Sequence, residues 1–182
     1  MKWLQHLFGG EKDMAALTAG TKAPDFSSAG LDGGKFSLRE ALLRGPVFAV
    51  FFKTSCPTCQ YAFPYFERLY KAHGGGTVSF VAISQDDAGK TRGFLKEFGV
   101  TFPTALDDPN GYVASNAYGL TNVPTWFLIA QDGTIELSSV GWSKKDVEEL
   151  NLRLAEAKAP AQKNSPPPLF RVGEDVRDFR AG

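Results

Sequence analysis

The sequence predicts an α/β fold in which a mixed β-sheet is covered by helices on both faces. Two observations predict it. Continuous apolar runs alternate with amphipathic helical patterns in the first part of the chain, and a strand hairpin followed by a helix closes the pattern. A third observation sets the scale: 182 residues suit one domain, whose core is large enough to fold without metal or disulfide staples.

The first half of the pattern contains two strands and two helices. The apolar run at residues 47–52 is typical of a central strand buried on both faces. Apolar residues at helical spacing then predict a helix over 57–73, which three glycines end. A second buried strand is expected at 78–83, and another amphipathic helix at 88–98.

The second half turns antiparallel. Two apolar segments, 126–129 and 135–137, flank the turn sequence at 131–134, which predicts a β-hairpin. Ser143 with Asp146 three residues later reads as a capping pair that opens the last helix.

Composition divides the chain into three parts. We expect an N-terminal arm or short helix at 1–19, one α/β domain at 20–158, and a Pro-rich linker with a tail at 159–182. The tail carries enough apolar residues to dock on the domain, but not enough to fold alone. The sequence leaves open whether it wraps the domain, joins a second subunit or covers the active site.

Charge and hydropathy exclude several functions. Twenty Lys and Arg balance twenty Asp and Glu, and nucleic-acid binders or anionic-membrane binders need a basic excess. No run of 18 apolar residues predicts a membrane span. Residues 1–18 start like a signal peptide but lack its uninterrupted apolar core, which favours a cytoplasmic protein. The alternative is a periplasmic protein, or one associated with a membrane through residues 1–18.

Both cysteines of the chain lie in one motif, Cys56-Pro57-Thr58-Cys59, between the first buried strand and its helix. At a helix start, free backbone N–H groups and the macrodipole favour a thiolate over a thiol. Pro57 suits the first helical turn, since it has no N–H to leave unpaired. Two intervening residues let one thiol reach a mixed disulfide on the other. Cys56 is therefore the predicted nucleophile and Cys59 the resolving thiol.

A metal-binding interpretation of the motif is less favoured. A closed zinc site needs four ligands, and the only histidines, His6 and His73, have no usable spacing to the cysteines. No metal is expected, and no cofactor other than the redox-active Cys56–Cys59 disulfide. His73 is predicted to cap or pack its helix. The acidic pairs Asp86-Asp87 and Asp107-Asp108 are predicted to be helix caps.

From about residue 20 to residue 157 the chain resembles the thioredoxin superfamily, and within it the TlpA/ResA-like thiol–disulfide oxidoreductases, relatives of the AhpC/TSA redoxins. Three segments carry the resemblance: Ala23-Pro24-Asp25-Phe26, the strand and loop at 51–59, and Asn122-Val123-Pro124-Thr125. The resemblance implies a thioredoxin-like fold. It also implies that Val123 and a cis Pro124 pack against the motif and bind substrate together with Pro57 and Thr58.

The chain also departs from the family at three positions. Ser55 replaces the Trp that usually precedes the first cysteine, and Val50 and Ala62 stand where the family carries a carboxylate that moves protons at the second cysteine. Lys53 is the nearest cation by sequence and is expected either to favour the Cys56 thiolate or simply to be exposed at a strand end.

The resulting function is a thiol–disulfide oxidoreductase whose partners are a client protein with a disulfide and an upstream thiol reductant. One alternative is a peroxiredoxin-like thiol peroxidase, although Lys53 and Ala49 occupy positions where that family has Thr and Pro. The other is a soft-metal, copper-binding module, whose usual distant His ligand is missing.

Overall fold

The computed structural model describes residues 15–158 and 165–182, and it has the predicted α/β architecture. In the described part of the chain, seven strands form one sheet in the order β2-β1-β5-β4-β3-β6-β7, and a two-stranded sheet joins β8 and β9. The elements are β1 (Ser27–Gly30), β2 (Lys35–Ser37), α1 (Leu38–Leu42), β3 (Val47–Phe52), α2 (Pro57–His73), β4 (Ser79–Ser84), α3 (Ala88–Glu97), β5 (Thr104–Leu106), α4 (Val113–Ala117), β6 (Thr125–Ile129), β7 (Ile135–Val140), β8 (Trp142–Ser143), α5 (Lys144–Lys158) and β9 (Phe179–Arg180).

The sheet is mixed, as its sequence pattern predicts. Strands β3, β4 and β5 run parallel to one another, whereas β6 is antiparallel to β3 and forms a hairpin with β7. Strand β3 lies inside the sheet between β4 and β6, and all six of its residues are buried. Its sequence is apolar throughout because packed cores cover both faces of the strand.

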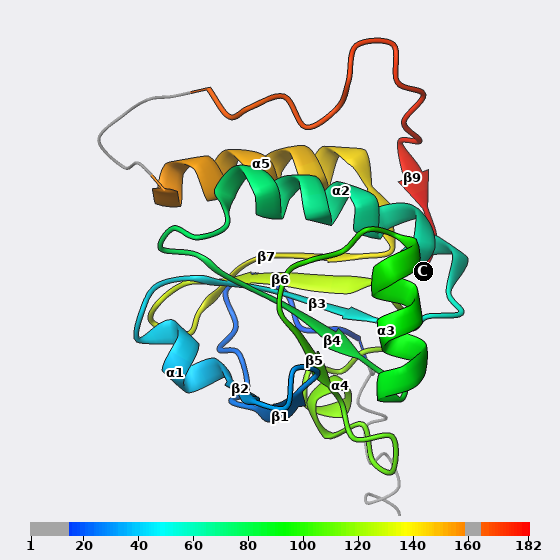
Figure 1. Ribbon diagram of the computed structural model, residues 1–182. Helices are drawn as coiled ribbons and strands as arrows, with labels where there is room; N and C mark the ends of the chain where they lie inside the picture. Colours follow the sequence, from blue (N-terminus) through cyan, green and yellow to red (C-terminus); the bar gives the residue numbers. More distant parts are fainter. Residues whose placement is uncertain (1–14, 159–164) are drawn as a thin grey trace, which may run out of the picture.

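Alternate residues of β3 point into two cores. Phe48, Val50 and Phe52 belong to the core beneath α2, α3 and α5, while Val47, Ala49 and Phe51 belong to the core beneath α1 and α4. Figure 1 shows α2 and α5 side by side on one face of the sheet and α1 and α4 on the other. Because β3 is fixed on both faces, the loop that follows it is held rigidly at the sheet edge.

Among the polar residues, the expectations for Asp87, Asp107 and His73 are correct, and those for Asp86 and Asp108 are wrong. Asp108 is not a helix cap, because its carboxylate accepts from the Asn110 N–H in the loop before α4. The Asp87 side chain caps α3 by accepting from the Lys90 N–H at 2.9 Å, and Asp107 accepts from two N–H groups at the start of α4. His73 is buried at the end of α2 and lies 2.7 Å from Asn151 of α5. Asp86 is not a helix cap, because its carboxylate accepts from the N–H and hydroxyl of Thr54 in the motif loop.

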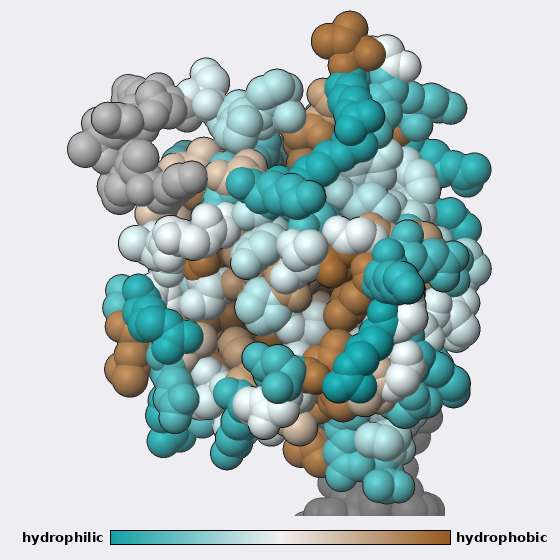
Figure 2. All heavy atoms as spheres, viewed as in Figure 1, coloured by the Kyte–Doolittle hydropathy of each residue, from teal (hydrophilic) through white to brown (hydrophobic). Residues whose placement is uncertain are grey.

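The described part of the tail, residues 165–182, lies across α2 and α5 (Figure 1). Leu169 is buried in the core beneath these helices, and Asn151 donates its amide to the Pro167 carbonyl at 2.9 Å. Residues 159–164 of the predicted linker and residues 1–14 of the predicted arm lie outside the described part of the chain. Within those residues, no helix is both long and apolar enough to cross a bilayer. Figure 2 shows hydrophilic side chains over most of the viewed face, with apolar groups in small patches between them.

Candidate active site

Cys56 lies in the loop between the end of β3 and the start of α2. It is the N-cap of α2, and its sulfur accepts a hydrogen bond from the Cys59 N–H at 3.4 Å. Pro57 occupies the first turn, as expected of a residue without an N–H donor. The sequence folds this way because the apolar strand ends at Phe52 and the helical pattern begins at the motif.

The environment of Cys56 favours a thiolate. Its pKa is lowered from 9.0 to about 6, first because the Cys59 thiol donates to it, and further because the N–H groups of Cys59 and Thr58 point at it and Arg180 carries a positive charge nearby. Partial burial raises the pKa of Cys56 and is the second-largest influence, but the hydrogen bonds and the positive charge together outweigh it. Cys56 is half-buried, so its sulfur remains accessible.

Cys59 has the opposite character. It is fully buried, and burial is the main cause that raises its pKa far above the usual range for a thiol. The neighbouring Cys56, as acceptor and as negative charge, raises it further, and so does the carboxylate of Asp86. The two sulfurs of one short motif therefore differ strongly in acidity.

The loop before β6 lies against the motif. The Val123–Pro124 peptide bond is cis, and Cys56 Sγ lies 3.2 Å from the Val123 carbonyl oxygen. Pro124 is buried, while Pro57 is exposed beside the thiolate and Thr58 is buried under it. The structure thus brings the predicted residues of this site together around one accessible sulfur.

Lys53 is exposed, and the cation that acts on Cys56 is Arg180. That Lys53 tunes the Cys56 thiolate stays a prediction. Val50 and Ala62, which stand at the two carboxylate positions of the family, are both fully buried. The carboxylate that the structure brings to bear on Cys59 comes instead from Asp86, which follows β4.

The sequence leaves open whether the tail covers the active site, and the structure places residues 181 and 182 beside the motif. Thr58 Oγ1 donates to the Ala181 carbonyl at 2.5 Å, and Asn122 Nδ2 donates to the Gly182 carbonyl at 3.1 Å. The apolar residues of the tail indicate that it docks on the domain, but no local pattern indicates which surface of the domain it contacts. Among the described residues, no three His, Cys, Asp or Glu side chains gather as a metal site would require.

Comparison with known proteins shows which family the chain belongs to. The model of the Redoxin family matches residues 18–154. The thiol-disulfide oxidoreductase ResA of Bacillus anthracis is 30% identical over 135 residues, covering 74% of this chain and 76% of that protein. ResA of Halalkalibacterium halodurans is 32% identical over 139 residues, covering 75% and 77%.

A solved structure extends this likeness to three dimensions. The thiol:disulfide interchange protein of the thioredoxin family from Chlorobium tepidum superposes with a TM-score of 0.62 at 28% identity, covering 79% of this chain and 99% of that one. The fold and the site thus define a thioredoxin-like thiol–disulfide oxidoreductase. The chain belongs to the Redoxin family and is similar to its TlpA/ResA-like branch.

The low pKa of Cys56 gives a pH prediction. The rate of alkylation of the reduced protein by iodoacetamide should rise about tenfold per pH unit below pH 6 and level off above a midpoint near 6, because only the thiolate reacts. The Arg180→Gln variant should move the midpoint to higher pH, since the nearby positive charge favours the thiolate.

Lys53→Gln is the matched control for this measurement, because it removes an exposed lysine charge close in sequence to Cys56. We expect its midpoint to be displaced less than that of Arg180→Gln, because Arg180 is the cation that lowers the pKa of Cys56. A larger displacement for Lys53→Gln than for Arg180→Gln would show that the loop lysine tunes the thiolate and that the tail arginine does not.

Proposed function

We propose that the protein reduces disulfide bonds in client proteins, with Cys56 as the nucleophile and Cys59 as the resolving thiol. The contrast between the two sulfurs supports this proposal most directly. An accessible sulfur with a lowered pKa is suited to attack, and a buried sulfur with a raised pKa is suited to wait as a thiol.

The exchange would take two steps. The Cys56 thiolate attacks one sulfur of the client disulfide, the client S–S bond breaks, and the first client sulfur leaves as a thiolate. Cys59 then loses its proton and attacks Cys56, which releases the second client thiolate. The client gains two electrons, and the protein is left with a Cys56–Cys59 disulfide.

The first step also prepares the second. While Cys56 is a thiolate, its charge and its acceptance of a hydrogen bond raise the pKa of Cys59. In the mixed disulfide, Cys56 no longer carries that charge, so these two influences fall away. The pKa of Cys59 then drops toward the range in which it can be deprotonated.

The surrounding residues would hold the client. Pro57 and Thr58 on the motif, with Val123 and Pro124 on the facing loop, surround the Cys56 sulfur and are proposed to bind the client backbone. An upstream thiol reductant would return the Cys56–Cys59 disulfide to the dithiol, and no other cofactor is proposed. The cytoplasmic location, with a periplasmic or membrane-associated protein as the alternative, stays a prediction.

A comparison of two oxidants tests the proposal. Fully reduced protein is mixed with oxidised insulin or with hydrogen peroxide under pseudo-first-order conditions, and loss of free thiol is followed by acid quench and mass spectrometry. We expect the reduced protein to lose its free thiols to insulin orders of magnitude faster than the Cys56→Ser variant does. Oxidation by peroxide far faster than that of an ordinary thiol would instead favour the peroxidase alternative.

A further inference from the structure

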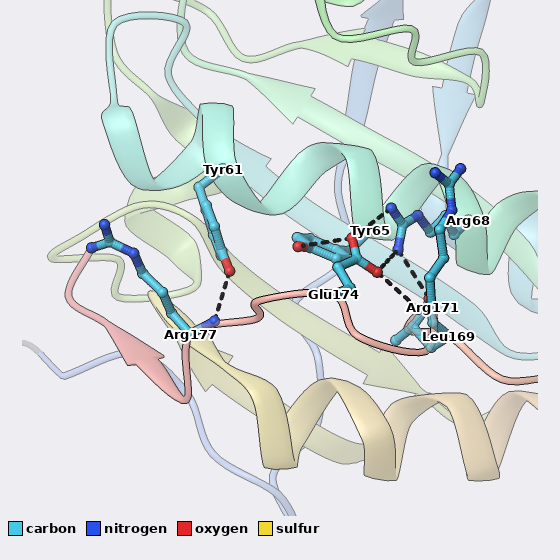
Figure 3. Close-up of polar contacts among 7 residues, drawn as sticks. All are labelled: Tyr61, Tyr65, Arg68, Leu169, Arg171, Glu174 and Arg177. Carbon is cyan, nitrogen blue, oxygen red and sulfur yellow. Dashed lines mark hydrogen bonds and ion pairs between the residues drawn. The ribbon is translucent and has the colours of Figure 1, made fainter.

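The tail is fastened to α2 by a chain of polar contacts that leads toward the active site. Arg68 forms a two-pronged ion pair with Glu174, with N–O distances of 2.8 Å, and also donates to the Leu169 carbonyl at 3.2 Å. About two turns nearer the motif, the Tyr61 hydroxyl accepts from the Arg177 N–H at 2.9 Å. Figure 3 shows these side chains of α2 pointing at the tail along its course.

Beyond Arg177 the tail becomes a strand. Strand β9 pairs antiparallel with β8, and the Trp142 indole N–H donates to the Arg177 carbonyl at 2.7 Å. Arg180 lies over the ring of Tyr61, with 5.8 Å from its guanidinium carbon to the ring centre. The segment therefore reaches the motif in an extended, fixed conformation.

The end of this segment lies on the surface that surrounds the Cys56 sulfur. Thr58 and Asn122 each donate a side-chain hydrogen bond to it, as described above. A Cβ built on Gly182 would lie 2.7 Å from the Val123 carbonyl oxygen, so only backbone fits this closely. The same carbonyl lies 3.2 Å from Cys56 Sγ.

Any client that presents a disulfide to Cys56 must lay its own backbone beside that sulfur. The donors of Thr58 and Asn122 and the edge of β8 would suit an extended segment, because each contact that the tail makes with them is to its backbone. The tail and a client would therefore compete for one surface.

We propose that residues 177–182 occupy the client-binding surface as an internal substitute, so that an extended, disulfide-bearing client segment must displace them before Cys56 can attack. This inference rests on the proposed function and adds its regulation. Displacement costs the contacts of the tail, which lowers the apparent affinity for protein clients. A small disulfide that needs no backbone surface escapes this cost.

The test loosens the tail at positions away from the reacting sulfurs. In the full chain, Glu174→Gln removes the ion pair with Arg68, and Tyr61→Phe removes the acceptor for Arg177 while keeping the tyrosine ring. The double variant carries both substitutions. Glu149→Gln is the matched control, since it removes a comparable carboxylate that pairs with Arg153 on α5 at 2.9 Å. Limited trypsin digestion at Arg177 reports whether the tail has been released.

Single-turnover rates are then measured at pH 8 with oxidised insulin and with bis(2-hydroxyethyl) disulfide. At this pH the Cys56 thiolate is fully formed, so loss of the Arg180 charge does not change its amount. The double variant should reduce insulin about three- to tenfold faster than the unmodified protein, the range expected for losing one ion pair and one hydrogen bond. Its rate with the small disulfide should change less than about twofold, and Glu149→Gln should change neither rate.

A second variant releases the tail by a different change, in case the double variant leaves it bound to the domain. Phe179 is exposed, so Phe179→Pro should break the β9 pairing without removing a core side chain. A tail cut readily by trypsin without faster insulin reduction would overturn the inference while leaving the proposed function intact. Failure of every variant, and of the unmodified protein, to reduce even the small disulfide would contradict the proposed function itself.

Discussion

Replacing Cys56 by serine should lower the rate of disulfide reduction at least about a thousandfold, because a serine hydroxyl is a far weaker nucleophile than a thiolate with a pKa of about 6. Replacing Cys59 by serine should have a different effect. The first attack should proceed at nearly the normal rate, and the reaction should then stop at a mixed disulfide on Cys56.

The two variants are separated by mass spectrometry without reducing agent. Cys59→Ser mixed with a client disulfide should gain the mass of the client, and dithiothreitol should remove it. Cys56→Ser should gain nothing, since Cys59 is fully buried. A covalent adduct on Cys56→Ser would mean that the roles of the two sulfurs are exchanged.

The second large effect concerns the aromatic core beneath the active site. Phe63 is fully buried on α2, one turn beyond Cys59. The centre of its ring lies 4.5 Å from the ring centre of Phe52 and 5.1 Å from that of Phe94. Phe63→Ala should lower the free energy of unfolding by about 3–5 kcal/mol, because it removes buried apolar surface and leaves a cavity in a closely packed core.

Urea denaturation of the reduced protein measures this loss. Leu43→Ala is the control, since Leu43 is 77% exposed and its truncation should change stability by less than about 0.5 kcal/mol. Equal losses for the two variants would show that the ring cluster around Phe63 does not carry the stability assigned to it. The reactivity of Cys56 in the folded Phe63→Ala variant would further show how firmly this core holds the start of α2.

Local sequence predicts the strand and the helix that carry the motif, and also the hairpin that follows them. The run at 47–52, the helix at 57–73 and the hairpin around 131–134 lie in the structure as strand β3, helix α2 and the turn between β6 and β7. Each has a strong periodic pattern or turn signal, so neighbouring residues already specify it. The short elements β1, β2, α1 and α4 were not predicted, because three to five residues carry too little periodicity.

The chemistry of the site divides in the same way. The spacing of Cys56 and Cys59 after a buried strand determined that the chain carries an exchangeable dithiol, since strand, helix start and motif are adjacent in sequence. Which charges act on the sulfurs was decided only by tertiary structure. Asp86, predicted as a helix cap, instead binds Thr54, and Arg180 lies 124 positions from Cys56 along the chain (180 minus 56).

The sequence by itself thus determined the fold class and the reacting pair, because both are written in short-range patterns of apolar residues and cysteines. Only the tertiary structure decided what surrounds the thiolate. The tail is placed there by the Arg68–Glu174 ion pair, the Tyr61–Arg177 contact and the pairing of β8 with β9. The two side-chain contacts join residues 106 and 116 positions apart, and helix α5 separates β8 from β9 in the sequence. Their partners are fixed by packing rather than by neighbours in the chain.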